Sequence, residues 1–190
     1  MSEVRCDISP KHTFIVQMIV SSLLAAIAFR LNNQGVLTGS MLISPIGSIV
    51  LKAALHNTKD LLSLSQIYIP LVVGVAAGFL PGSRVTKTLR NSGVDVIENP
   101  SYLIDASVIA ITCGILFPML RKVPEVGVDI ATQILPPIVA VGYCLALSVR
   151  KQLPWQSAFG CLLLFIVYFV CLFVSTRVTH SVLCKHKTSD

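Results

Sequence analysis

Charge is the scarcest feature of this 190-residue sequence. Asp, Glu, Lys and Arg make up 13% of it, whereas hydrophobic residues make up 54%. A soluble domain carries about 25% charged residues. The deficit excludes an ordinary water-soluble domain and indicates a protein that lies in a membrane.

Catalytic and metal-binding motifs are also missing. The six cysteines form no CxxC pair and have no zinc-type spacing with histidine. The sequence contains no Walker loop, dinucleotide fingerprint, HExxH or GxSxG motif. We therefore expect no enzyme activity, no catalytic residue, no cofactor and no bound metal.

The net charge of +6 does not indicate nucleic acid as a partner. The basic residues fall at or between apolar segments, where they would meet lipid headgroups. We expect the lipid bilayer as the partner, with a second copy of the chain or other membrane or assembly proteins as further candidates.

Six apolar runs long enough to cross a bilayer dominate what is present. They cover residues 13–31, 36–55, 61–80, 101–120, 126–149 and 155–176. The sequence predicts an all-α, polytopic membrane bundle of six transmembrane helices. A short tail, residues 1–12, precedes this single domain (13–176), and a basic tail, residues 177–190, follows it.

A polar connection, residues 81–100, divides the domain into two triplets of helices, 13–80 and 101–176. The connection has the composition of either a short helix on the membrane surface or an ordinary loop. Three crossings per half would make the triplets inverted repeats. A short match between 42–46 and 134–138, apolar-apolar-x-Pro-Ile, agrees with this arrangement.

Prolines interrupt the middle run of each triplet, at Pro45 and at Pro136-Pro137. Proline has no N–H and blocks the helical bond to the carbonyl four residues earlier. Such carbonyls persist in a membrane only where protein or water satisfies them. The broken second and fifth helices therefore predict a polar or transport site that comprises Met41, Ser44, Pro45, Asp129, Thr132, Gln133, Pro136 and Pro137.

Two aspartates near the starts of predicted crossings, Asp105 and Asp129, either cap a helix or take part in transport. Asp129 is the preferred candidate because Gln133 follows it by four residues, next to the double proline. Asp129 with freed carbonyls would bind a cation, whereas helix N-termini would favour an anion. The sequence leaves both open.

Two GxxxG pairs, Gly35 with Gly39 and Gly74 with Gly78, predict helix packing, because small residues let helices approach closely. Lys and Arg counts predict the orientation. Nine of the 15 lie on the side of both termini and six on the other, which favours cytoplasmic termini.

The run from Gly39 to Pro45, Gly-Ser-Met-Leu-Ile-Ser-Pro, resembles the signature of a family of polytopic membrane proteins called domain of unknown function 389. Leu135, Pro136, Pro137 and Gly142 match its second motif. The resemblance covers about residues 15 to 175. The chain lacks a further proline that the family carries shortly after the first. The resemblance implies a membrane fold and no established activity.

Two functions are open at this point. The first is a transporter or channel for a small solute or ion, with its site at the broken helices. The alternative is a structural or assembly protein that anchors or scaffolds a larger complex or a membrane-bearing particle.

Overall fold

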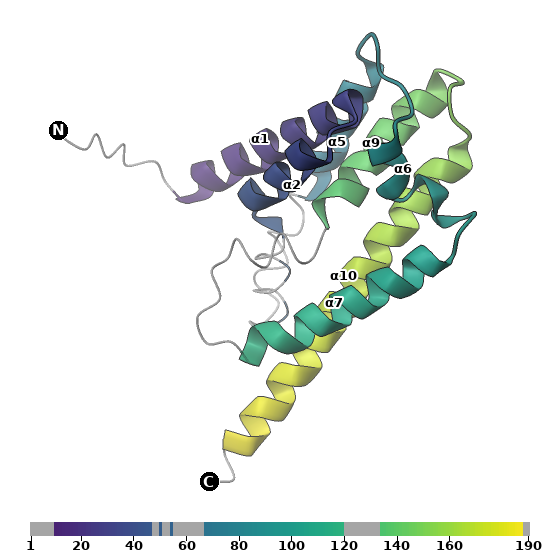
Figure 1. Ribbon diagram of the computed structural model, residues 1–190. Coiled ribbons are helices and arrows are strands. Elements are labelled where there is room, and N and C mark those ends of the chain that lie inside the picture. The colour runs from purple at the N-terminus through teal and green to yellow at the C-terminus, as the bar shows by residue number, and fades with distance from the viewer. Residues whose placement is uncertain (1–9, 47–49, 51–53, 55–66, 120–133, 188–190) are drawn as a thin grey trace, which may run out of the picture.

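The computed structural model describes residues 10–46, 50, 54, 67–119 and 134–187 (Figure 1). Over these residues the chain is all-α, as predicted. Seven α-helices and one 3-10 turn are described: α1 (Pro10–Leu31), α2 (Gln34–Ile43), α5 (Tyr68–Phe79), α6 (Lys87–Asn91), η3 (Val94–Val96), α7 (Ser101–Met119), α9 (Leu135–Val149) and α10 (Trp155–Lys187).

Among the described residues, two stretches of helix are long and apolar enough to cross a membrane. They are Thr13–Leu31 in α1, with 19 residues, and Trp155–Val182 in α10, with 28 residues. Among the shorter apolar helices, α2 and α5 have 10 and 12 residues, and α9 has 15. The remainder of the predicted runs 36–55, 61–80 and 126–149 lies largely outside the described residues.

The helices form two groups (Figure 1). In one group α9 packs against α5, and α1 contacts both α2 and α5. In the other, α7 and α10 lie side by side, and α10 also contacts α9. The lower end of α10 extends beyond α7 toward the C-terminus (Figure 1).

Glycines bring α5 and α9 into backbone contact. A Cβ on Gly74 would collide with the carbonyl oxygen of Val139, and one on Gly142 would collide with the carbonyl oxygen of Leu71. A Cβ on Gly78 would stand 2.8 Å from the carbonyl oxygen of Tyr143. Gly74 and Gly78 thus lie at a helix interface that admits only the smallest residue.

The other predicted glycine pair makes no such contact. No described residue lies within 4 Å of a Cβ built on Gly39, and on Gly35 the Cβ would meet only the side chain of Asn33, at 3.3 Å. Asn33 caps the start of α2, where its Oδ1 accepts from the Val36 amide at 3.1 Å. A glycine spacing alone therefore does not specify a packing face, because the partner helix must also lie on that side.

The polar connection is more ordered and more buried than either expectation for residues 81–100. It forms α6 and η3, which bury Leu89, Val94 and Val96. The hydroxyl of Thr86 donates to the Phe29 carbonyl at 2.7 Å. This hydrogen bond joins the segment to the end of α1, and the apolar residues of the segment face the bundle.

Two arginine side chains donate hydrogen bonds to backbone carbonyls at the end of α5. Arg30 donates to the carbonyl of Pro81 at 2.8 Å, and Arg150 donates to the carbonyls of Gly78 and Leu80, both at 3.2 Å. The last carbonyls of a helix have no intrahelical partner and carry partial negative charge, so cations stabilise them. Arg30 lies near the end of α1, and its bond to the backbone that follows α5 is exposed.

Candidate functional site

The first proline break coincides with the end of a helix. α2 ends at Ile43, and Ser44 adopts an extended conformation with φ −71° and ψ 131°. A residue before proline avoids the helical region, because the proline ring clashes with it there. The Ser44 hydroxyl then accepts from the Ile46 amide at 3.3 Å, which turns the chain at this point.

The second break has a different form. α9 begins at Leu135, so Pro136 and Pro137 occupy its first turn. First-turn amides have no intrahelical acceptor, and proline costs little there. Within the described residues the two prolines start a helix rather than kink one. The predicted site residues Asp129, Thr132 and Gln133 lie outside the described residues. The same holds for the carbonyls of Thr132 and Gln133, which the double proline was expected to free.

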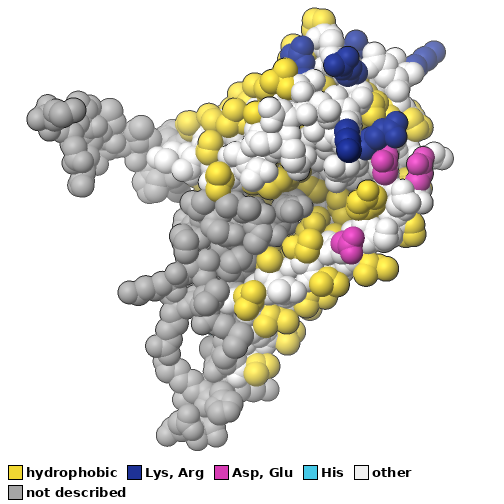
Figure 2. All heavy atoms as spheres, viewed as in Figure 1, with side chains coloured by type: hydrophobic (Ala, Val, Ile, Leu, Met, Phe, Trp, Pro, Cys, Tyr) yellow, Lys and Arg dark blue, Asp and Glu magenta, His cyan; other side chains and the backbone are white. Residues whose placement is uncertain are grey.

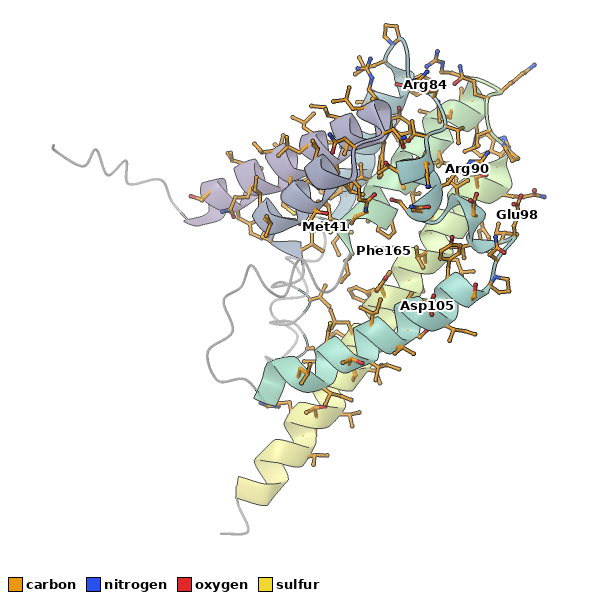
Figure 3. The ribbon with its side chains drawn as sticks, viewed as in Figure 1. Met41, Arg84, Arg90, Glu98, Asp105 and Phe165 are labelled. Atoms are coloured by element: carbon orange, nitrogen blue, oxygen red, sulfur yellow. The ribbon has the colours of Figure 1, made fainter. Side chains whose placement is uncertain are left out.

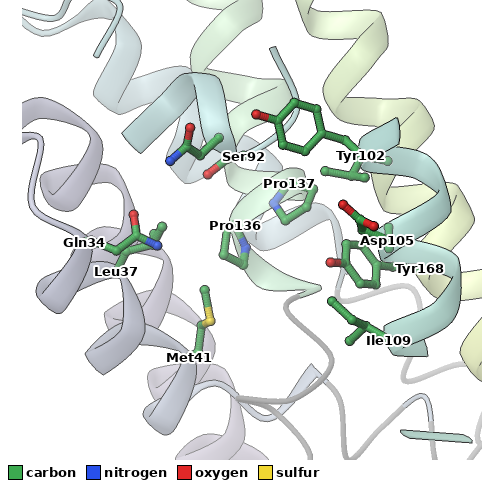
Figure 4. Close-up of a pocket in the computed structure, with 13 residues that line it drawn as sticks. Gln34, Leu37, Met41, Ser92, Tyr102, Asp105, Ile109, Pro136, Pro137 and Tyr168 are labelled. Carbon is green, nitrogen blue, oxygen red and sulfur yellow. The ribbon is translucent and has the colours of Figure 1, made fainter. Parts of the chain in front are cut away.

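A pocket of about 300 Å³ lies between one face of α2, the end of α6 and the turn after it, the first half of α7, the start of α9 and the middle of α10 (Figure 4). It brings Met41 together with Pro136 and Pro137. Its described lining residues are Gln34, Leu37, Met41, Asn91, Ser92, Tyr102, Asp105, Ala106, Ile109, Pro136, Pro137, Leu164 and Tyr168. Ser44 and Pro45 are not among them.

Asp105 is the one charged side chain among the described lining residues. Its side chain is exposed, from the second turn of α7. It was the less favoured of the two aspartates in the sequence, because nothing near it in the chain suggested a polar site. The pocket's polar atoms come instead from segments far apart in the sequence.

Besides Asp105, five polar residues of the described lining were not predicted, and one of them is Asn91 at the end of α6. Gln34 and Ser92 come from α2 and the turn after α6, and Tyr102 comes from the first turn of α7. Tyr168 comes from α10, one helical turn after Leu164 on the same face. A tyrosine within a long apolar helix is the one sequence signal that was available, because its hydroxyl needs a polar surrounding.

The start of α9 is a poor place for an anion. A helix N-terminus binds anions through its free backbone amides. Here the second and third helical residues are Pro136 and Pro137, which carry no amide hydrogen. Of the two ligand charges that the sequence left open, the pocket favours the positive one, because Asp105 lines it as well.

No group of three or more His, Cys, Asp or Glu side chains that could hold a metal ion occurs among the described residues. The described lining also contains neither histidine nor cysteine.

The fold and the pocket define an all-α protein with two long apolar helices and a partly polar cavity between its helix groups. The chain belongs to the family described as Domain of unknown function (DUF389), whose model matches residues 40–174. The match begins later than the expected residue 15 and includes Met41, Asp105 and the double proline. No match was found among curated proteins or among solved structures.

Proposed function

We propose that this protein is an integral membrane protein that binds a small solute or ion in the pocket beside Asp105 and carries it across the bilayer. The single observation that carries the proposal is the pocket itself. It joins the end of α2, the proline start of α9 and a carboxylate on α7, all within helices of strongly apolar composition.

Apolar surfaces on the outer faces of three helices support the membrane location. Large hydrophobic side chains repeat every four residues along the exposed face of α10: Leu162, Ile166, Val170, Val174, Val178 and Val182. Similar exposed rows run along α1 and α7, where Figure 2 shows hydrophobic side chains on the surface. Water disfavours such large apolar patches, whereas lipid tails accommodate them.

The distribution of charge fits the same proposal. The described Lys and Arg at the end of α1 and in the segments that follow α5 and α9 lie at one end of the molecule (Figure 2), whereas Arg177 lies in the second half of α10. Arg84 and Arg90 lie at this end, away from Met41 (Figure 3). Basic side chains at the ends of apolar helices are typical of the headgroup region. In a chain of six crossings this end of the molecule is the one opposite the termini. We propose six crossings arranged as two inverted triplets, with both termini in the cytoplasm, because nine of the 15 Lys and Arg lie on the side of the termini and six on the other.

A charge introduced on the exposed apolar face of α10 tests the membrane location. Val170→Lys puts a charge in the middle of the exposed apolar row, and we expect insertion to become less favourable by about 2.5–3.5 kcal/mol. Gln156→Lys, at the exposed start of the same helix, serves as the matched control. The measurement is the membrane-integrated fraction after in vitro translation with microsomes. Equal insertion of both variants would contradict a lipid-facing α10.

Flux into proteoliposomes tests transport. We expect wild-type protein to carry a small cation, and Asp105→Asn to lose most of that flux while it remains folded, because the side chain is exposed. Glu98→Gln, on the same side of the molecule but outside the pocket (Figure 3), should leave flux unchanged. Asp129→Asn is the third variant in the same assay, because the sequence favoured Asp129 as the site aspartate. Absence of flux in every variant, wild type included, would remove the transport proposal.

We propose binding or transport rather than catalysis, since the described lining pairs no serine or cysteine with histidine. A scaffold role is the second candidate. The observation that favours it is the exposed row on α10, which extends past α7 and offers another membrane protein a long contact surface (Figure 1). Copurification of a stoichiometric partner lost on Val178→Ala and Val182→Ala would support this role.

A further inference from the structure

The pocket combines one carboxylate with two aromatic rings. Asp105 and Tyr102 come from α7, and Tyr168 comes from α10 (Figure 4). The described lining contains no lysine, arginine or histidine. The only formal charge within it is therefore negative, and a cation is the complementary ligand.

A bare metal ion does not suit this lining. Calcium takes six to eight oxygen ligands, and magnesium requires a compact octahedron of oxygens. The pocket offers one carboxylate within a volume of about 300 Å³. That space is large enough for a small organic molecule.

The walls point to a cation that carries carbon. Leu37, Met41, Ala106, Ile109 and Leu164 line the pocket with apolar surface. Aromatic faces attract alkylammonium groups through the ring quadrupole, and groups of aromatic residues recognise quaternary ammonium ligands in this way. A thioether such as that of Met41 adds a polarizable contact.

We propose that the pocket binds an alkylammonium group, with Asp105 opposite the charge and Tyr102 and Tyr168 against the alkyl substituents. This inference deepens the proposed function, since it assigns a ligand class to the same pocket. The ammonium group belongs either to a free amine or to a lipid headgroup, because the lining includes exposed side chains of α7, Tyr102 and Ile109.

Choline binding tests the proposal. The full chain, in nanodiscs of phosphatidylglycerol, is titrated with choline and with 3,3-dimethylbutan-1-ol, its uncharged isostere. We expect choline to bind about tenfold more tightly than the isostere. Asp105→Asn should remove this preference, and Glu98→Gln should retain it. Equal binding of the two probes, undetectable binding of choline at millimolar concentration, or an unchanged preference in Asp105→Asn would overturn the proposal.

The tyrosines distinguish a ring contact from a hydroxyl contact. Tyr168→Phe should keep choline affinity within about threefold, whereas Tyr168→Leu should lower it about tenfold, since only the latter removes the aromatic face. Tyr168 is 5% exposed. If its replacement destabilises the protein, Tyr102→Leu, at a 40% exposed ring, makes the same comparison. Full affinity in folded Tyr102→Leu and Tyr168→Leu would overturn the aromatic assignment.

Nanodiscs that contain phosphatidylcholine identify the source of the ammonium group. Competition by this lipid supports a lipid headgroup as the ligand, and undiminished choline binding supports a soluble amine. Comparison with the flux assay separates this inference from the proposed function. Choline binding without flux contradicts transport alone, whereas flux without a preference for ammonium over its isostere contradicts this inference alone.

Discussion

The α5–α9 pair and the α7–α10 pair both contain close helix contacts, but their surroundings differ. In α9 every residue from Leu135 to Ser148 is buried except Leu145. In α10 only 39% of the most apolar window within Trp155–Val182 is buried. A helix that is apolar on all sides lies in an interior or in lipid. In the first pair α9 lies in the interior of the molecule, whereas α5 buries only Pro70, Gly74, Ala77 and Gly78. The second pair provides much of the apolar surface.

The atoms that the glycines contact also differ between the two pairs. Gly74 and Gly142 face backbone atoms of the partner helix, whereas Gly114 of α7 faces the side chain of Ser175 on α10. The pocket takes Pro136 and Pro137 from the first pair, and Asp105 and Tyr168 from the second. The comparison teaches that the candidate site lies at the junction between a pair in backbone contact, which includes the buried helix α9, and a more exposed pair.

Gly142→Ala should have the largest effect of the predictions on stability. The added Cβ would collide with the Leu71 carbonyl and approach the Val75 amide at 2.8 Å, and neither backbone group can rotate away. We expect a loss of about 1–3 kcal/mol in the free energy of unfolding. The measurement is thermal or denaturant unfolding in detergent.

Gly39→Ala is the control for this change. It lies in α2 with no described atom within 4 Å, and helix propensity predicts a gain of about 0.5–1 kcal/mol. If both variants shift stability equally, the α5–α9 contact is not as close as the glycines indicate.

Arg150→Ala tests the hydrogen bonds at the end of the α5–α9 pair. Removal of the guanidinium leaves the carbonyls of Gly78 and Leu80 without this donor. We expect a loss of about 1–2 kcal/mol, because hydrogen bonds to charged groups contribute more than neutral ones. Gln152→Ala, at an exposed neighbour, should leave the unfolding midpoint unchanged, and a loss of equal size there would contradict a specific role for Arg150.

Gly114→Ala applies the same change to the α7–α10 pair. Its Cβ would collide with the Ser175 hydroxyl oxygen, which a rotamer change can move away, and would stand 2.9 Å from the Ser175 Cβ and 3.0 Å from the Leu172 carbonyl oxygen. We expect a loss of about 1 kcal/mol, smaller than for Gly142→Ala. The double variant with Gly142→Ala should show additive losses, since the two glycines lie at different interfaces. A strongly non-additive result would indicate that the two pairs form one packing unit.

Two left-handed residues give the smallest effects, with opposite signs. Lys151 has φ 58° and Asn32 has φ 53°. Lys151→Gly should stabilise the protein by about 0.5–1 kcal/mol, because glycine adopts this conformation without steric cost. Asn32→Gly should destabilise it, since the Asn32 Oδ1 accepts from the amide and hydroxyl of Thr88 at 2.9 and 3.0 Å. Unfolding midpoints that move in the same direction would show that backbone strain decides both.

Much of the secondary structure was predictable. The runs 13–31 and 155–176 correspond to α1 and α10, although α10 continues to Lys187. The helix that ends before Pro45 also follows from the chain alone, because a proline restricts the residue before it. Residues 81–100 were harder to predict, since burial of Leu89 and Val96 depends on contacts with distant helices.

The candidate site was only partly predictable. Met41 and the two prolines of α9 were expected together, and the pocket contains all three. Asp105 was less favoured than Asp129 because, from the sequence alone, a charged residue can be judged only by its neighbours in the chain. Tyr168 and Gln34 gave no sign of facing the same space, as they stand far apart in the sequence.

The amino-acid order by itself determined which segments are apolar and where prolines interrupt them, because hydropathy and a missing amide act over a few residues. That α9 begins at its proline pair was not among the predictions. Only the tertiary structure decided that Asp105, Tyr168, Met41 and Pro136 surround one pocket. The direction in which a helix face points depends on how its neighbours pack, and here that is set by glycine contacts such as those of Gly74 and Gly142.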